Sequence, residues 1–367
     1  MTEKYIGLMS GTSIDGMDAV LVAFHNNTPD ILASHSNPIT DELRQLILTL
    51  CTSGSHEIEQ MAVAEREIAR LSAKTVNELL ERSGEQSENI NAIGSHGQTV
   101  RHLPDIGYTL QIGDPSLIAE LTGITVVSDF RRRDIAAGGQ GAPLVPAFHK
   151  AVFASKTEHR VIVNMGGISN LSILPANALA PVTGFDTGPG NMLMDFWCQK
   201  HKNMPFDRNG VWAASANESQ TLLSAMMSDP FFHLAPPKST GRERFNAFWL
   251  EEQLKHFPSL TSATVQATLC QLTVTAISRA IKQYAPATET VFVCGGGAKN
   301  KTLMRLLQSQ LGDIPLSSTQ SLAIDPALVE SVAFAWLARQ TLHHKAGNLP
   351  EVTGAEGLRV LGGIYPA

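Results

Sequence analysis

Apolar and polar positions along the first 130 residues alternate in a way that predicts short strands and amphipathic helices. Apolar runs at 5–9 and 19–22 flank a stretch of small polar residues and carboxylates, which indicates two strands joined by a tight turn. Apolar residues at helical spacing predict a helix over 41–50 and a longer one that starts near 61 and ends at Gly84. Further strands are expected at 31–35, after 90, at 108–112 and at 124–127.

The pattern begins again after a glycine-rich stretch at 136–146. Residues 160–174 read as a strand, a polar glycine turn and a second strand, which is the plan already met at 7–22. Two such hairpins at the starts of two halves indicate an internal duplication. Helical periodicity then predicts three helices, at 265–284, at 301–310 and after an Asp325–Pro326 cap.

Composition bounds the class of protein. A chain of 367 residues is long enough for two domains, and 43% hydrophobic with 17% charged residues is globular. The net charge of -6 disfavours nucleic acid as the main partner. The four cysteines lie far apart without a CxxC pair, which disfavours zinc and disulfides and fits a reducing cytosol. With no signal segment and no membrane-spanning apolar run, a cytoplasmic protein without membrane contact is expected.

The turn of the first hairpin has the composition of a phosphate site. Its glycines allow close backbone approach, successive N–H groups can cradle an anion, and carboxylates suit Mg2+. An ordinary glycine-rich hairpin is the alternative. The candidate residues are Gly11, Thr12, Ser13, Ile14, Asp15, Gly16, Met17 and Asp18.

Two further groups of polar residues follow strands in the first half. His96 and Thr99 come after the strand that begins near 90, where α/β folds place ligand groups. Arg131 belongs to three consecutive arginines between a strand and the flexible stretch 136–146. Arginine forks pair with carboxylates and phosphates, so a clamp is expected, although such a run can equally be a solvated face.

Asp186 is the strongest catalytic candidate. It is expected at the tip of a short strand that ends at Phe185, before a Gly-Pro-Gly turn that opens a helix. The dipole at the start of that helix would keep the carboxylate ionised, and an ionised Asp can take a proton from water or a hydroxyl. The alternative is a helix N-cap.

The second half carries three more candidate segments. Asn164, Gly166 and Gly167 form the polar turn of the second hairpin. The triplet Gly295, Gly296 and Gly297 follows a buried strand and lets the backbone lie against a ligand; it is not GxGxxG, so NAD is disfavoured. Glu330 lies in the first turn of the last helix, where it either faces a ligand or complements the helix dipole. The polar stretch 236–245 is expected to be a mobile lid or a solvated loop.

Seven blocks, in this order and over almost the whole chain, resemble the anhydro-N-acetylmuramic acid kinase family. The blocks are SGTSIDGMD (10–18), GSHGQT (94–99), DFRRRDIAAGGQGAPLVP (129–146), NMGGISN (164–170), GFDTGPGNMLMD (184–195), CGGGAKN (294–300) and DPALVESVAFAWLA (325–338). Any one of these blocks would be weak, but all seven in order are specific.

The resemblance implies an α/β fold of the actin, hexokinase and sugar-kinase (ribonuclease H-like) type, with two domains flanking a nucleotide and substrate cleft. We expect domains at 1–130 plus 345–367 and at 131–344. The implied enzyme uses ATP and Mg2+ to convert 1,6-anhydro-N-acetylmuramic acid into N-acetylmuramic acid 6-phosphate in cell-wall recycling. A homodimer is also implied.

The same resemblance implies residue roles. Asp186 would activate a water molecule. The first turn (11–18) and the turn at 164–167 would hold the ATP phosphates, and the triplet 295–297 would lie by the adenosine. Thr99, Arg131 and Glu330 would contact the sugar, and Mg2+ would be carried mainly by the ATP phosphates.

Other function classes stay open at this point. A kinase of another sugar or a carboxylate would share the fold, and substrate screening separates it. An ATP-driven chaperone or actin-like protein would hydrolyse ATP slowly without an acceptor. A serine hydrolase with Ser10 or Ser13 as nucleophile is disfavoured because the chain has no GxSxG elbow.

Overall fold

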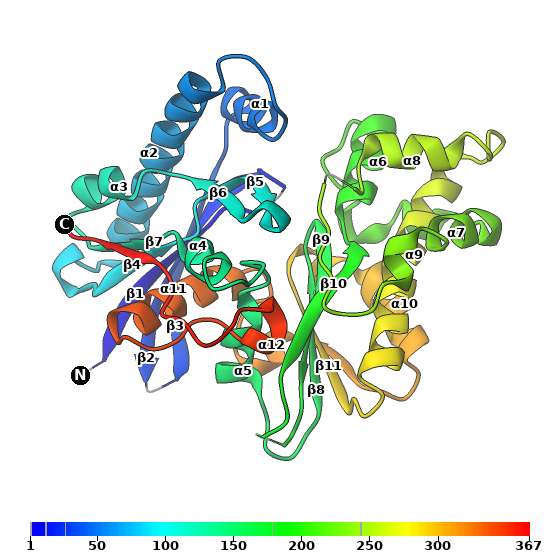
Figure 1. Ribbon diagram of the computed structural model, residues 1–367. Coiled ribbons are helices and arrows are strands. Elements are labelled where there is room, and N and C mark those ends of the chain that lie inside the picture. The colour runs from blue at the N-terminus through cyan, green and yellow to red at the C-terminus, as the bar shows by residue number, and fades with distance from the viewer. Residues whose placement is uncertain (1, 12, 26, 178, 243) are drawn as a thin grey trace. The chain divides into compact units, whose positions relative to one another are not determined.

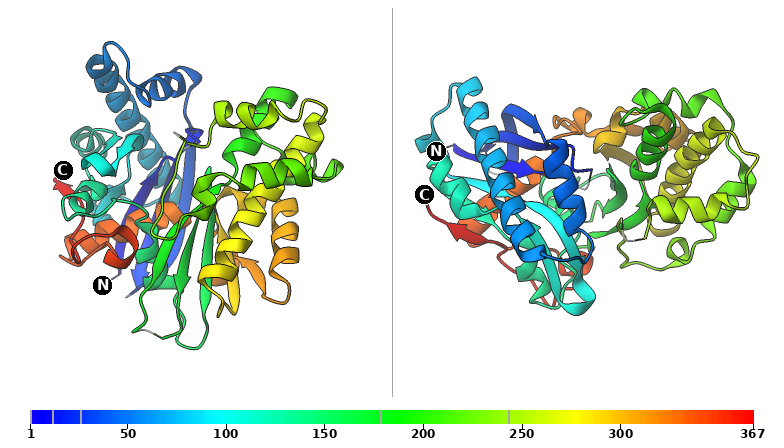
Figure 2. Two further views of the ribbon diagram at one scale, coloured as in Figure 1. Left: turned by 45° about the vertical axis from the view of Figure 1, so that its right-hand side comes forward. Right: turned by 90° about the horizontal axis from the view of Figure 1, so that it is seen from above.

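The computed structural model describes residues 2–11, 13–25, 27–177, 179–242 and 244–367. The chain divides into two compact units (Figures 1 and 2). The first unit comprises Met1–Val152 and Leu328–Ala367, and the second comprises Phe153–Ala327. Each unit is built on its own sheet, and each is described in turn below.

The first unit contains a sheet with the order β13-β7-β4-β1-β2-β3. The first three strands form an antiparallel meander, β4 then pairs parallel to β1, and β7 pairs parallel to β4. A separate hairpin joins β5 and β6. The strands are β1 (Glu3–Met9), β2 (Gly16–His25), β3 (Thr28–Pro38), β4 (Ala92–Ser95), β5 (Gln98–Leu103), β6 (Tyr108–Ile112), β7 (Val126–Ser128) and β13 (Gly363–Tyr365).

Helices cover both faces of this sheet. Side chains alternate between the two faces of a strand, so Ile6 and Leu8 of β1 pack toward the α1–α3 side, and Gly7 faces α11. A Cβ on Gly7 would lie 1.8 Å from the Ser331 carbonyl oxygen, which shows how closely α11 approaches the strand. The helices are α1 (Asp41–Leu50), α2 (Glu57–Ser83), α3 (Pro115–Thr122), α4 (Phe130–Ile135), α5 (Val145–Phe153), α11 (Val329–Leu342) and α12 (Pro350–Thr353).

The second unit repeats the strand plan of the first. Strands β8, β9 and β10 form an antiparallel meander, β11 pairs parallel to β8, and β12 pairs parallel to β11. The sheet order is therefore β10-β9-β8-β11-β12, with β10 at an edge (Figure 1). The strands are β8 (Arg160–Met165), β9 (Ile168–Leu174), β10 (Thr183–Pro189), β11 (Thr290–Cys294) and β12 (Leu316–Ser318).

A buried apolar cluster joins this second sheet to its helices. It includes Val163 and Val293 from the central strands and Leu269 and Ile277 from the long helix α9. The fully buried Cys270 belongs to the same cluster. The helices are α6 (Met192–Lys202), α7 (Gln220–Met227), α8 (Ala247–Leu254), α9 (Ser262–Tyr284) and α10 (Lys301–Leu311).

Most predicted elements are present, with differences at their ends. Helix α2 ends as expected at Gly84, whose φ of 69° is the left-handed conformation that favours glycine at this position. The predicted cap of the last helix was wrong: α11 begins at Val329, and Asp325 instead accepts the Ala327 N–H at 2.8 Å in a turn before the helix.

The units divide at other positions than the expected ends at 130/131 and 344/345. The observed divisions lie at 152/153 and 327/328. The difference has a physical cause, because α5 and α11 contribute to the core of the first unit. The rings of Phe148 in α5 and Trp336 in α11 lie 6.1 Å apart, and α11 packs against β1 and β4.

Candidate active site

The first hairpin turn is closed by a hydrogen bond within its own backbone. The Ile14 N–H donates to the Gly11 carbonyl at 3.2 Å, and Ile14 adopts a left-handed φ of 57°. Ile14 and Met17 are 2% and 1% exposed, so both residues are buried within the turn. Asp15 is exposed. Thr12, which was predicted to bind ATP, lies outside the described residues.

The other members of this turn are held by the strands. Asp18 is half-buried near the start of β2 and pairs with Met9 of β1. A Cβ on Gly16 would lie 2.9 Å from the Asn37 carbonyl oxygen, so the turn sits tightly against the end of β3. The turn therefore offers backbone groups and carboxylates, which is the composition expected of a phosphate site.

Arg131 is fixed by two acceptors in the first unit. Its Nε and Nη2 lie 3.2 and 2.9 Å from His96 Nε2, and its Nη1 donates to the Gly141 carbonyl at 2.8 Å. Burial lowers the pKa of His96 well below its ordinary value, and the positive charge of Arg131 lowers it further. A neutral His96 can accept from the guanidinium, so the pair holds the arginine fork in one orientation. The three arginines lie in a short helix, α4, just before the glycine-rich stretch 136–146.

The remaining sugar-side candidates also belong to the first unit. The Thr99 hydroxyl accepts from Gln111 Nε2 at 3.2 Å across the β5–β6 hairpin. Next to Thr99, Gln98 Oε1 accepts from the buried Ser10 hydroxyl at 2.7 Å, which links this hairpin to the first turn. Glu330 is half-buried in the first turn of α11.

Asp186 lies inside a strand, which corrects the expected position at a strand tip. Strand β10 runs through it to Pro189, and Asp186 pairs with Asn170 of β9. The register shifts between Asp186 and Gly188, so a bulge replaces the expected turn. Helix α6 begins at Met192, soon after the glycine turn as expected, and the effect of its dipole on the charge of Asp186 stays a prediction.

The Asp186 carboxylate is held by a loop that sequence reasoning did not connect with it. The Thr240 N–H donates to Asp186 Oδ2 at 2.9 Å, and the Asp186 N–H donates to the Lys238 carbonyl at 3.1 Å. Lys238 is 9% exposed and lies close enough for the negative charge of Asp186 to raise its pKa, although burial dominates and lowers it. The only signal in the sequence was the polar stretch 236–245.

The glycine turns of the second unit converge. The Gly190 N–H donates to the Gly167 carbonyl and the Asn191 N–H to the Gly166 carbonyl, each at 2.8 Å. Asn164, at the end of β8, lies beside the triplet, because a Cβ on Gly295 would be 2.5 Å from Asn164 Oδ1. An added side chain would clash at Gly190 and at Gly295, so the backbones of neighbouring turns approach closely there, as in a phosphate cradle.

Gly297 and Asn191 also lie beside these glycine turns, and both contact Met165. A Cβ on Gly297 would lie 2.5 Å from the Met165 Cβ, and Asn191 Nδ2 donates to the Met165 carbonyl at 3.2 Å. Gly296 has more space, with its nearest neighbour, Asn191 Nδ2, at 3.7 Å from an added Cβ. Asn191 is a site residue that the sequence did not single out.

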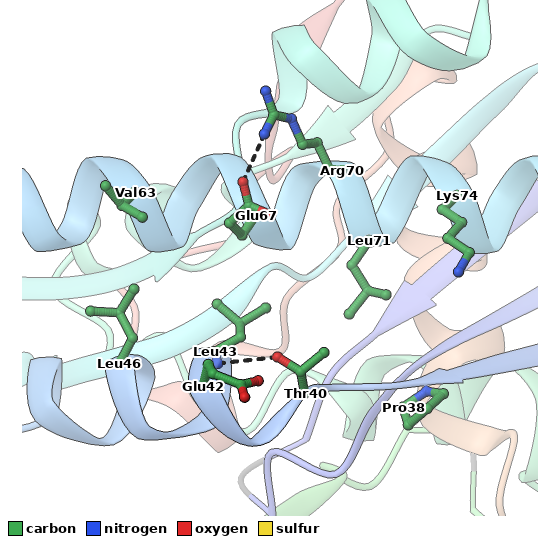
Figure 3. Close-up of a pocket in the computed structure, with 10 residues that line it drawn as sticks. All are labelled: Pro38, Thr40, Glu42, Leu43, Leu46, Val63, Glu67, Arg70, Leu71 and Lys74. Carbon is green, nitrogen blue, oxygen red and sulfur yellow. Dashed lines mark hydrogen bonds and ion pairs between the residues drawn. The ribbon is translucent and has the colours of Figure 1, made fainter.

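A pocket of about 450 Å³ in the first unit lies between α1 and α2 (Figure 3). It is lined by Leu43, Leu46 and Leu71, with the Glu67–Arg70 ion pair at its rim. None of the predicted site residues lines it.

No group of three or more His, Cys, Asp or Glu in the described part of the chain could hold a metal ion. Mg2+ in nucleotide sites commonly takes one or two carboxylates together with phosphates, so the carboxylates of the first turn fit an ion delivered with ATP. Among the described helices, none has the length and apolar character to cross a membrane.

Two sheets with the same strand plan, each opened by a hairpin with a glycine turn, define an α/β fold of the actin, hexokinase and sugar-kinase type. The chain belongs to the family described as Anhydro-N-acetylmuramic acid kinase, whose model matches residues 3–367.

Relatives with the same name cover the chain from end to end. One from Pseudomonas fluorescens (strain Pf0-1) is 52% identical over 362 residues, which are 99% of this chain and 99% of the relative. One from Shewanella sp. (strain MR-7) is 52% identical over 368 residues, which are 99% of this chain and 98% of the relative. Both are called anhydro-N-acetylmuramic acid kinase.

Solved structures resemble the chain more distantly. The activator of the 2-hydroxyisocaproyl-CoA dehydratase from Clostridium difficile with bound ADPNP is 14% identical, with a TM-score of 0.49 and 91% and 93% of the two chains covered. A ROK family glucokinase from Streptomyces griseus in complex with glucose and AMPPNP is 11% identical, with a TM-score of 0.43 and 92% and 99% covered. The family assignment rests on the sequence match, not on these likenesses.

Proposed function

We propose that this protein is the phosphotransferase its family name describes. It uses ATP to open 1,6-anhydro-N-acetylmuramic acid and to phosphorylate O6, giving N-acetylmuramic acid 6-phosphate for cell-wall recycling. The observation that carries the proposal is the family match over residues 3–367. The half-buried, hydrogen-bonded setting of Asp186 supports it, because a general base must be held in place.

The chemistry of an anhydro sugar fixes what the residues must do. The substrate has no free 6-hydroxyl, so water adds at the anomeric carbon while the bond from that carbon to O6 breaks. O6 then takes the γ-phosphoryl group, whose bond to the bridging oxygen of ADP breaks. Asp186 takes the proton from the water. The carboxylate Oδ2 accepts the Thr240 N–H at 2.9 Å, which limits rotation of the base.

The other candidate residues would bind and orient the two substrates, ATP and the sugar. The backbone of the first turn (11–18) and of the turn at 164–167 would hold the ATP phosphates, and the triplet 295–297 would lie by the adenosine. Arg131, whose orientation is set by His96, would pair with the lactyl carboxylate of the sugar. Thr99 and Glu330 would contact the same substrate.

Three further properties belong to the proposal. Mg2+ would accompany ATP and neutralise phosphate charge during transfer. Asp15 and Asp18 are the carboxylates of the first turn that could contact this ion. The protein would act in the cytoplasm, which suits the recycling of an internalised sugar. It would form a homodimer.

Incubation with ATP, Mg2+ and 1,6-anhydro-N-acetylmuramic acid in 18O-labelled water tests the reaction. We expect mass spectrometry to find the label on the anomeric oxygen and the phosphate on O6. ADP without a sugar phosphate would favour an ATP-driven binding protein instead. Phosphorylation of another sugar or carboxylate in preference would indicate a different kinase of the same fold.

Replacing Asp186 tests its assignment as the base. We expect Asp186→Asn to lower turnover by about 10²–10⁴-fold, because the amide cannot take a proton and a positioned base contributes an effect of this size. Steady-state formation of ADP and of sugar phosphate measures the loss. Asp313→Asn is the matched control, since Asp313 is an exposed carboxylate of the same unit. Retained turnover in Asp186→Asn would remove Asp186 from the catalytic role.

A further inference from the structure

Residues 238–241, here called the strap, lie against the edge strand that carries Asp186. An edge strand has unpaired backbone groups, and the strap pairs one of them through the bond from the Asp186 N–H to the Lys238 carbonyl. Two residues on, the Thr240 N–H reaches the Asp186 carboxylate at 2.9 Å. The strap thus grips both the backbone and the side chain of one residue.

Lys238 anchors the first end of the strap. Its Nζ donates to the Phe231 carbonyl at 3.1 Å and lies 4.6 Å from the centre of the Phe231 ring. Only 9% of this lysine is exposed, which is unusual for a residue type that is almost never fully buried without a partner. A buried cation bound to a carbonyl and an aromatic face resists displacement, because leaving would break both contacts.

Asp229 anchors the region just beyond the other end. The Arg244 N–H group donates to the Gly241 carbonyl at 3.2 Å, and the Arg244 side chain donates to Asp229 Oδ1 from Nε at 3.0 Å and from Nη2 at 2.5 Å. Asp229 Oδ2 also accepts from the Trp249 indole at 3.0 Å. Asp229 caps the short helix Pro230–His233, which is the segment that Lys238 binds.

An aromatic cluster fills the space beneath the strap. The Phe231 and Phe245 rings lie 5.5 Å apart, and those of Phe245 and Trp249 lie 5.1 Å apart. Phe232 belongs to the same cluster and reaches the bulge of β10, where a Cβ on Gly188 would lie 2.7 Å from its ring. Both ends of the strap are therefore connected to the aromatic cluster, which also contacts the strand that bears Asp186.

We propose that Lys238 is a positioning residue for Asp186, acting through the strap, which holds carboxylate Oδ2 so that the base meets the attacking water in one orientation. This inference rests on the proposed function, because it assigns Asp186 as the base. Lys238 itself touches no reacting atom. Loss of its anchor would release the Thr240 N–H and let the carboxylate rotate, and a misplacement near 1 Å costs up to about 10²-fold in rate.

The main test compares Lys238→Met with the wild type. Methionine keeps an unbranched apolar side chain and removes the charge and the donor that contact Phe231. We expect kcat to fall by about 10- to 100-fold while the KM for the sugar stays within about twofold, since the strap aligns the base rather than the substrate. Lys238→Arg restores a cationic donor and should recover part of the turnover. Lys200→Met, which breaks an ion pair with Glu251 in the same unit, should leave kcat unchanged.

A second arm separates positioning from general stability. In the Asp186→Asn background, Lys238→Met should lower kcat by no more than about twofold further, because residues that act as one unit are not additive. A purely structural lysine would lower the melting temperature and reduce kcat equally in both backgrounds. An unchanged kcat in Lys238→Met, or the same loss in both backgrounds, would overturn the proposal.

Asp229→Asn repeats the test from the other end of the strap. The amide keeps the shape but loses the charge that binds Arg244, so we expect a loss in kcat in the same direction, again with little change in the KM for the sugar. If Lys238→Met does not fold, this variant decides alone. If the wild type forms no sugar phosphate, the proposed function fails. If Asp186→Asn keeps full turnover, the assignment of Asp186 as the base fails, and the strap proposal fails with it. If Asp186→Asn is impaired but the strap variants keep full turnover, only the strap proposal is refuted.

Discussion

Gly190→Ala is expected to lower kcat/KM for ATP more than it lowers stability, because the added methyl group would press on the turn at 164–167, which is proposed to bind the ATP phosphates. A Cβ at this position lies 2.2 Å from the Gly166 carbonyl oxygen and 2.7 Å from Ser169 Oγ. Cβ contacts in folded proteins essentially never fall below 3.0 Å, so the carbonyl must move by about 0.8 Å, the difference between 3.0 and 2.2 Å. That oxygen accepts the Asn191 N–H, and the Gly190 N–H donates to the Gly167 carbonyl.

The expected magnitudes follow from this displacement. Overpacking of this kind costs about 1–3 kcal/mol of stability, an amount that a folded unit survives. A shift approaching 1 Å in a phosphate-binding backbone should lower kcat/KM for ATP by about 10- to 100-fold. The loss should appear mainly for ATP rather than for the sugar, since Gly166 and Gly167 belong to the proposed phosphate turn.

Steady-state kinetics with each substrate varied in turn, together with thermal melting, measures both effects. Gly54→Ala is the control, because an added Cβ on Gly54 meets nothing within 4 Å. A Gly190→Ala variant with a lower melting temperature and an unchanged kcat/KM for ATP would refute the assignment of residues 164–167 to the phosphates. It would leave the turn as a structural element only.

Two further predictions concern stability. Burial lowers the pKa of His149 from 6.5 to about 3, so the unfolded chain binds a proton first as the pH falls below 6.5 and stability is lost from there toward pH 3. His149 should account for about 2 kcal/mol of the decrease in unfolding free energy between pH 7 and pH 5. Urea unfolding at the two pH values measures this decrease, which should be smaller by that amount in His149→Gln. Asp134 is fully buried and accepts from the Gly141 N–H, Asn348 Nδ2 and Thr353 Oγ1, each at 2.8 Å. In Asp134→Asn the new amide NH2 group would face one of these three donors, so the free energy of unfolding should fall by about 1–3 kcal/mol in the same urea assay. A decrease smaller than the error of the measurement would contradict this description of the network.

Local patterns predicted the elements of this chain well. The polar glycine turn between apolar runs is the β1–β2 hairpin, and the same plan at residues 160–174 is β8–β9. The helix with apolar residues at helical spacing ends at Gly84, as its left-handed φ of 69° requires. These successes share a cause: side-chain periodicity and turn chemistry are decided within a few residues of sequence.

Contacts between distant segments could not be predicted in the same way. The Thr240 N–H and the Asp186 carboxylate are 54 positions apart, and nothing in the pattern around either residue names the other. The bulge after Asp186 is also invisible to period-2 reasoning, which is why a strand end was expected there. The residue type of Arg131 indicated a clamp, but only the structure shows that Arg131 lies in helix α4 and contacts the neutral His96.

The two sheets share a strand plan but differ at their edge strands. In each sheet the third strand of the meander lies at the edge, β3 in one and β10 in the other. Every second residue of β3 is exposed, whereas β10 is buried or half-buried throughout. The segment that follows β10 supplies the cover, because the strap pairs with Asp186 and the aromatic cluster reaches Gly188. A solvated edge strand could not hold a carboxylate in one orientation, since water would compete for each of its bonds. The strand plan therefore positions Asp186, and the segment after β10 supplies the hydrogen bonds that hold it.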